Sequence, residues 1–213
     1  MIMPPNIRKL ALIAHVTSSV GWFGAVGVFL ALAVIGLTSQ EPERVRAVYI
    51  AMDLSGWYVI VPLCFVSLAT GFIQALGTTW GLFRHYWVVS KLLITVLATA
   101  LLVMHMGPTD RVAGAAVARI LSGADLHGLR VQLAVDAGAA LLALLTATTL
   151  SVYKPRGLTQ YGLCKQEEQG VASYRGSITN AWRWAYFFGI IAIVLMVVRH
   201  LTVGGHHGGY RVP

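Results

Sequence analysis

The chain has 213 residues, of which 57% are hydrophobic and only 11% are charged, whereas a soluble globular protein carries roughly 25% charged residues. This composition excludes an ordinary soluble domain and indicates an integral membrane protein in contact with lipid. The net charge of +8 comes from basic residues that lie mostly beside apolar blocks, which favours membrane orientation and anionic lipid over a nucleic-acid partner.

Five apolar stretches are long enough to cross a bilayer, because a spanning helix needs roughly 20 mainly apolar residues. They lack the alternation of barrel strands, so their backbone groups must be hydrogen-bonded within each segment, as helices. We therefore predict an all-α fold: a single polytopic transmembrane bundle over residues 1–213, with about five spanning helices, four in the core plus one. In chain order the stretches are Leu10–Leu37, Trp57–Leu76, Tyr86–Met106, Val131–Val152 and Trp184–Val203.

Two connections carry helical patterns of their own. Thr38–Gly56 begins polar and then places apolar residues at helical spacing, so it either extends the second spanning helix or lies on the surface. Pro108–Gly128 combines apolar residues with Arg111 and Arg119, which predicts an interfacial helix between the third and fourth spans.

Orientation follows from the basic residues and from the first apolar stretch. The loop 153–180 holds the clearest basic cluster, which favours a cytoplasmic position for that loop and hence for the N-terminus. Leu10–Leu37 is much longer than the roughly 7–15 apolar residues of a signal peptide, so we expect an uncleaved first helix. The cluster comprises Lys154, Arg156, Lys165 and Arg175.

Four ionisable residues lie within the apolar stretches, where such residues are costly and point to function. His15 and Lys91 come about five residues into the first and third stretches, which run in the same direction, so they should share one depth. His105 follows Lys91 by 14 residues, roughly 21 Å along a helix, at the far end of the third stretch. Asp136 comes early in the antiparallel fourth stretch. The sequence thus predicts two polar layers, His15 with Lys91 and His105 with Asp136.

Helical periodicity places these residues on defined faces. Lys91 and His105 share one stripe of the third helix with Thr95, Ala98 and Leu102, and His15 shares a stripe of the first helix with Ser19, Trp22 and Val26. Each group also has a simpler interpretation. Lys91 can extend to the interface, and His105 with Asp136 can be a structural pair.

The residue types suggest haem b as cofactor. A neutral histidine in a helical bundle is a typical axial ligand of haem iron, which assigns this role first to His15 and to His105 if a second haem is bound. A lysine can ligate iron when neutral or pair with a propionate when charged. Copper is the alternative, but Cu(I) prefers Cys and Met, and Cys64, Met104 and Met106 form no clear set with His15.

The same residues carry a resemblance to known families. The segment AHVTSSVGWFGAVGVF from Ala14, and HYWVVSKLLITVLATALLVMH from His85, resemble the first and third helices of the copper-resistance D membrane proteins and of the J-type protoporphyrinogen oxidases. An uncharacterised bacterial integral membrane family related to both is the nearest match. The J-type resemblance implies haem b, with His15 and Lys91 as the functional positions. The chain departs from that family in lacking a Gly-Leu-Phe-Tyr-Leu-Pro run after Trp22.

From these observations we expect a haem-b protein of the bacterial inner membrane that acts in electron transfer or haem-dependent oxidation, with one or two haems. His15, Lys91, His105 and Trp22 are the candidate cofactor contacts, and Asp136 forms a polar pair suited to proton transfer or quinone binding. A quinone, a redox protein and a second copy of the chain are the candidate partners. The alternatives are copper transport or resistance, and a non-catalytic subunit whose polar residues fix helix packing.

Overall fold

The computed structural model describes residues 3–77, 81–120, 124–154 and 158–167. Within these residues the chain is helical throughout its main elements, and its one strand-like feature is an isolated bridge between His85 and Leu158. The elements are α1 (Pro5–Thr38), α2 (Pro42–Ser55), the π-helical turn η1 (Gly56–Ile60), α3 (Val61–Gly77), α4 (Tyr86–Val117), α5 (Ala124–Tyr153) and α6 (Gln160–Glu167).

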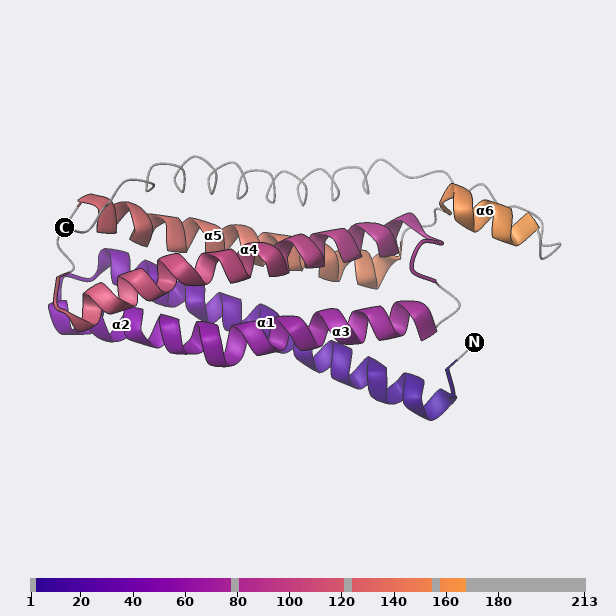
Figure 1. Ribbon diagram of the computed structural model, residues 1–213, viewed down its shortest axis with the longest axis horizontal. Helices are drawn as coiled ribbons and strands as arrows, with labels where there is room; N and C mark the ends of the chain where they lie inside the picture. The colour runs from indigo at the N-terminus through magenta and orange to yellow at the C-terminus, as the bar shows by residue number, and fades with distance from the viewer. Residues whose placement is uncertain (1–2, 78–80, 121–123, 155–157, 168–213) are drawn as a thin grey trace, which may run out of the picture.

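The long helices form an antiparallel bundle (Figure 1). α1 and α4 run in one direction, and the α2–η1–α3 helix and α5 return in the other. α1 packs against α3 and α5, while α4 packs against α5 and α2, so α1 and α4 lie diagonally across the bundle. Side chains from these two helices can therefore meet only in its interior.

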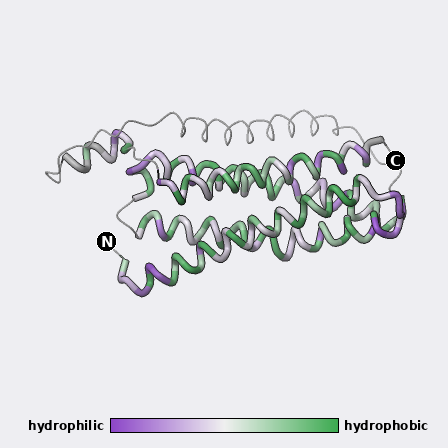
Figure 2. The backbone as a smooth tube through the Cα atoms, turned by 180° about the vertical axis from the view of Figure 1, so that it is seen from behind, coloured by the Kyte–Doolittle hydropathy of each residue, from purple (hydrophilic) through white to green (hydrophobic). Residues whose placement is uncertain are grey.

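Within the part of the chain that the structure describes, four helical segments are long and apolar enough to span a membrane, which confirms the predicted all-α transmembrane bundle. They are Pro5–Thr38, Pro42–Gly77, Tyr86–Val117 and Leu126–Tyr153, and hydrophobic residues dominate their central parts in Figure 2. Large apolar side chains on the outside of every one of these segments are exposed, as contact with lipid tails requires. The fifth predicted span, Trp184–Val203, lies outside the described residues.

The connections differ from the sequence-based expectations at one place and agree at another. Thr38–Gly56 does extend the second span, since α2 passes through η1 directly into α3. The interfacial helix predicted over Pro108–Gly128 is wrong, because α4 continues through Pro108 to Val117. Proline removes one helical hydrogen bond, but α2 packs against this part of α4 and buries Val112 and Ala116 completely, which holds the helix together.

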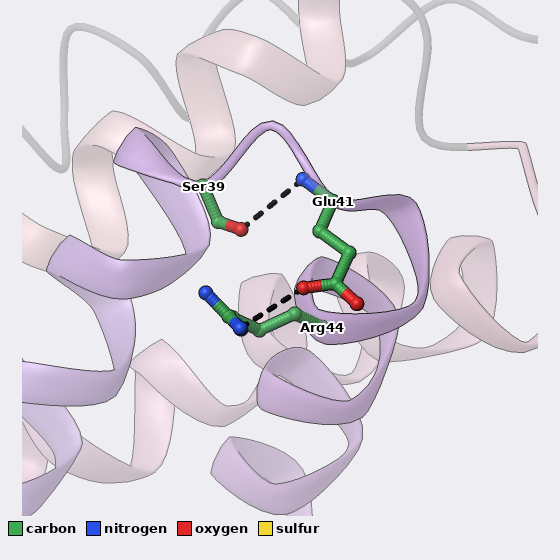
Figure 3. A network of polar contacts seen from close by, with 3 residues as sticks. All are labelled: Ser39, Glu41 and Arg44. Carbon is green, nitrogen blue, oxygen red and sulfur yellow. Dashed lines mark hydrogen bonds and ion pairs between the residues drawn. The ribbon is translucent and has the colours of Figure 1, made fainter.

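A short polar turn reverses the chain between α1 and α2 (Figure 3). The Glu41 backbone N–H donates to Ser39 Oγ at 3.3 Å, and the Arg44 guanidinium pairs with Glu41 at 3.0 Å. Pro42 occupies the first turn of α2, where its missing N–H costs nothing. This turn sets α2 antiparallel to α1.

The same end of the bundle is closed by Arg130 of α5. Its Nε donates to the Tyr49 hydroxyl at 2.8 Å, its guanidinium lies over the Tyr49 ring, and a terminal nitrogen donates to the Gly36 carbonyl oxygen. A cation at the C-terminus of α1 also opposes the helix dipole. One side chain thereby joins α1, α2 and α5.

Candidate functional site

The first polar site joins α1, α3 and α4 near the N-terminal end of α1. His15 Nδ1 lies 3.0 Å from the Ser67 carbonyl oxygen and 3.2 Å from Thr70 Oγ1, and His15 Nε2 lies 3.3 Å from Lys91 Nζ. Both His15 and Lys91 are half-buried. The predicted His15–Lys91 layer is confirmed.

The contacts of His15 define the tautomer of its ring. A carbonyl oxygen only accepts, so Nδ1 carries the hydrogen and donates to Ser67. In the neutral imidazole Nε2 then keeps its lone pair and accepts from the Lys91 amine. The result is an imidazole that is anchored on one nitrogen and presents the other, as a base, toward the bundle interior.

The surroundings of His15 hold this orientation. Ser19 and Ser67 share a hydrogen bond of 2.7 Å, and the Gln74 side chain donates to the Ala11 carbonyl oxygen at 2.9 Å. Gly71 lies against the ring, since a Cβ placed there would come within 3.2 Å of His15 Cε1. α3 thus supplies a polar and closely fitting wall for the imidazole.

The second polar site joins α4 and α5 deeper in the bundle. His105 Nδ1 lies 3.1 Å from Asp136 Oδ2, and the side chains are 8% and 3% exposed. The distance is that of an ion pair, but neither His105 nitrogen has the geometry of a hydrogen bond to any described residue, and Asp136 Oδ1 has no partner there either. The predicted pairing of these two residues is confirmed.

The depth of this pair differs from the expectation. Because α4 runs on to Val117 and α5 begins at Ala124, His105 and Asp136 lie in the middle third of their helices rather than near an end. The hydropathy pattern ends at Met106, whereas the helix does not. The structure therefore places the second pair well inside the folded bundle.

Trp22 belongs to the second site and not to the first. Its side chain is 3% exposed, its Nε1 has no hydrogen-bond partner among the described residues, and it lines a cavity of about 40 Å³ together with His105 and Asp136. The surface of the cavity is apolar throughout, and its wall also includes Phe29 and Leu102. The helix-1 stripe thus serves both sites, with His15 at one and Trp22 at the other.

Hydroxyl groups occupy the interior between the two sites. Thr95 and Thr99 each donate to the carbonyl oxygen four residues earlier on α4, and Cys64 Sγ lies 3.7 Å from Thr99 Oγ1. These bonds satisfy the hydroxyls locally, as is usual in membrane helices. Cys64 is therefore a packed, buried thiol without a metal-like set of neighbours.

Two contacts were not foreseen from the sequence, one at the first polar site and one that joins three helices at the end of the bundle. The anchor of His15 is a backbone carbonyl, at Ser67, and backbone groups leave no mark in a residue pattern. The Arg130–Tyr49–Gly36 contact joins residues up to 94 positions apart, and nothing in their local spacing pairs them. The hydroxyl residues of α3 were the available signal for the first contact.

No protein-family model, curated protein sequence or solved structure matches the chain. The function therefore has to be argued from the two sites. Among the described residues no three His, Cys, Asp or Glu side chains converge in a way that could hold a metal ion by themselves.

Proposed function

We propose that the protein binds haem b with His15 as axial ligand and acts in electron transfer or haem-dependent oxidation in the bacterial inner membrane, with its N-terminus in the cytoplasm. The observation that carries this proposal is the His15 ring, whose Nδ1 is bonded to the Ser67 carbonyl while Nε2 faces Lys91. Histidines that ligate metals are commonly oriented in this way by a carbonyl on the second nitrogen.

The donor chemistry of the first site fits iron better than copper. An imidazole and a lysine amine are both nitrogen donors, and haem needs only axial ligands because its own nitrogens supply the rest. Copper(I) would need soft sulfur ligands, and the one described cysteine near the interior, Cys64, is bonded to Thr99. The absence of any three-residue metal cluster in the described part of the chain also favours a cofactor that brings its own ligands.

The spacing of the two nitrogens supports Lys91 as the second contact. His15 Nε2 and Lys91 Nζ are 3.3 Å apart, so two nitrogen donors from α1 and α4 face the same point in the bundle interior. Lys91 serves as second ligand when neutral or as a partner for a propionate when charged.

A single haem is proposed. Of the two buried-site histidines, His15 has one nitrogen held by a backbone carbonyl, as expected for a metal ligand, whereas His105 is paired with Asp136 instead. When bound, haem supplies the one-electron chemistry. The residues of this chain hold it, orient His15 through Ser67, and place Lys91 where it can bind or donate a hydrogen bond.

The test is an absorption spectrum of the purified full-length protein with and without dithionite. We expect a Soret band and a sharp α band on reduction, lost in His15→Ala and shifted in Lys91→Met. His127→Ala is the matched control, because His127 is exposed on the same protein, and it should leave the spectrum unchanged. A colourless protein with stoichiometric copper contradicts the proposal in favour of copper handling, and one with neither favours a packing role for these residues.

A further inference from the structure

The long helices of the bundle exceed the thickness of a bilayer. α1 has 34 residues, the α2–η1–α3 segment has 36 and α4 has 32, which correspond to roughly 48–54 Å at a rise of about 1.5 Å per residue. The hydrocarbon core of a bilayer measures about 30 Å, and helix tilts of about 0–40° do not remove so large a difference. Part of the bundle therefore lies outside the hydrocarbon, and its surface side chains indicate which part.

One stretch of each long helical segment, of about the 20 residues that a membrane span needs, has an apolar surface. We call these stretches, residues 10–29, 56–77, 86–106 and 134–153, the lipid band. Side-chain contacts place them at one level: Gln74 bonds to the Ala11 carbonyl near one edge, and Gly56 lies against Met106 at the other. Within the band no described Asp, Glu, Lys, Arg or His side chain is exposed, whereas large apolar side chains are exposed on all four stretches.

Aromatic side chains mark both edges of the lipid band. Trp57 and Tyr58 are exposed at one edge, and Tyr86 and Tyr153 are exposed at the other. Trp and Tyr are enriched where a membrane meets water. The exposed basic residues just beyond the second edge are Arg8, Lys9 and Lys154. The band thus has the edges that a bilayer requires on both sides.

Beyond Trp57 the surface of the bundle is charged. We call residues 30–55, 107–117 and 124–133 the protruding end, which includes the turn drawn in Figure 3 and carries hydrophilic residues in Figure 2. Asp110 is exposed and accepts a hydrogen bond from Trp57 Nε1 at 2.8 Å. The side chains of Arg44 and Glu43 are 61% and 71% exposed. Charged side chains are costly against hydrocarbon, so this surface faces water or lipid headgroups.

The protruding end also has an apolar core of its own. Four apolar residues of α2 are buried at helical spacing, while its charged residues point outward, which is the pattern of a helix in water. Water drives such burial, but lipid does not. The core residues of α2 and their neighbours in the same cluster are Val45, Val48, Tyr49, Met52, Ala33, Val112 and Leu133. This core accounts for the apolar run of α1 beyond Phe29.

We infer that bilayer hydrocarbon covers only the lipid band, and that the protruding end stands outside it as a small water-facing four-helix bundle. With the N-terminus in the cytoplasm, as proposed above, this end lies on the outer side of the membrane. His105 then lies within one helical turn of the outer edge of the band. The inference explains why His105 is near the end of an apolar run and yet in the middle third of α4. It does not depend on haem at His15.

The first experiment measures where hydrocarbon ends along α1. Spin labels are placed in Val20→Cys and Ile35→Cys, whose native side chains are 65% and 40% exposed, in a Cys164→Ser background because Cys164 is exposed and Cys64 is buried. The full-length protein is reconstituted in vesicles of phosphatidylethanolamine and phosphatidylglycerol. Collisions of each label with oxygen, which dissolves in hydrocarbon, and with a water-soluble nickel chelate are measured by electron paramagnetic resonance.

We expect oxygen collisions to dominate for the label at position 20 and nickel collisions to dominate for the label at position 35, with a several-fold difference in their ratio. The apolar run of α1 by itself, which continues to Leu37, would instead place both labels in lipid. Any result in which the label at position 35 is not more accessible to the nickel chelate than the label at position 20 overturns the inference.

The second experiment introduces a charge at the same two positions. Val20→Lys should raise the unfolding equilibrium constant by roughly a hundredfold, as expected for a lysine at the centre of a membrane span, or prevent folding altogether. Ile35→Lys should change it by no more than about twofold, as for an ordinary surface substitution. Val20→Ala and Ile35→Ala are the matched controls for lost packing. Equal effects of the two lysines overturn the inference.

Discussion

The two polar sites of the bundle differ in the partners that they provide for their buried ionisable groups. At the first site two bases meet: Ser67 and Thr70 anchor His15 Nδ1, and the lone pair of Nε2 accepts from the Lys91 amine. At the second site a base meets an acid, yet the ring nitrogens of His105 and one oxygen of Asp136 lack hydrogen bonds among the described residues. The first site is half-buried and the second is fully buried.

This difference separates two kinds of chemistry. An imidazole that is anchored through one nitrogen and held at the other only by an amine is suited to an electron-pair acceptor such as a metal, and a buried acid–base pair is suited to a proton. Distance keeps the functions apart, because Lys91 and His105 are 14 residues apart on α4, roughly 21 Å along its axis. The comparison can be tested by removing the partners at each site in turn.

The largest expected effect comes from the second site. Asp136→Ala leaves His105 buried without its acid, and breaking a buried pair in this way costs about 3–5 kcal/mol of unfolding free energy. Denaturant unfolding in detergent micelles measures the loss. The control is His105→Leu/Asp136→Leu, which removes both groups and should recover most of the stability. If the double variant is as unstable as Asp136→Ala, the pair is not the cause.

A smaller effect of opposite sign is expected at the first site. The Lys91 amine contacts His15, and no acidic side chain among the described residues forms an ion pair with it. Lys91→Met therefore removes a costly amine and should raise the unfolding free energy by about 1 kcal/mol, a fraction of the cost of lysine at a helix centre. The same unfolding measurement applies, with the haem spectrum recorded in parallel. A loss of stability would show that the His15–Lys91 hydrogen bond is structural. Removing one partner would then destabilise the protein at both sites, and the two sites would not differ.

The smallest change sharpens the geometry of the first site. In Gly71→Ala the new Cβ would lie 3.2 Å from His15 Cε1, so the ring must move by a few tenths of an ångström, while stability changes by no more than about 1 kcal/mol. We expect a shifted α band in the reduced spectrum. Gly138→Ala is the control, because its added Cβ would have no atom within 4 Å apart from its chain neighbours and the backbone of its own helix. Identical spectra for both variants would place His15 outside the cofactor site.

Much of the fold could be predicted because the length of an apolar run is a local property of the sequence. Apolar runs of about 20 residues predict spans, and helix direction then assigns His15 and Lys91 to one depth and His105 and Asp136 to another. Boundaries were less predictable: Pro108 and the polar residues that follow it indicated a break, and only the packing of α2 against Val112 and Ala116 explains why α4 continues. Helix ends depend on neighbours that the local pattern does not contain.

The sequence by itself determined the membrane environment and the helical bundle, because the free-energy cost of polar groups in lipid is read from consecutive residues. It also determined the pairing of the four interior ionisable residues by depth, because the helical rise per residue converts sequence position into depth. Only the tertiary structure decided which atoms meet. It placed the Ser67 carbonyl on His15 and brought Trp22 to the second pair, where all three side chains border a partly open cavity. Rotation of each helix about its own axis is set by packing with the others, and no single segment encodes it.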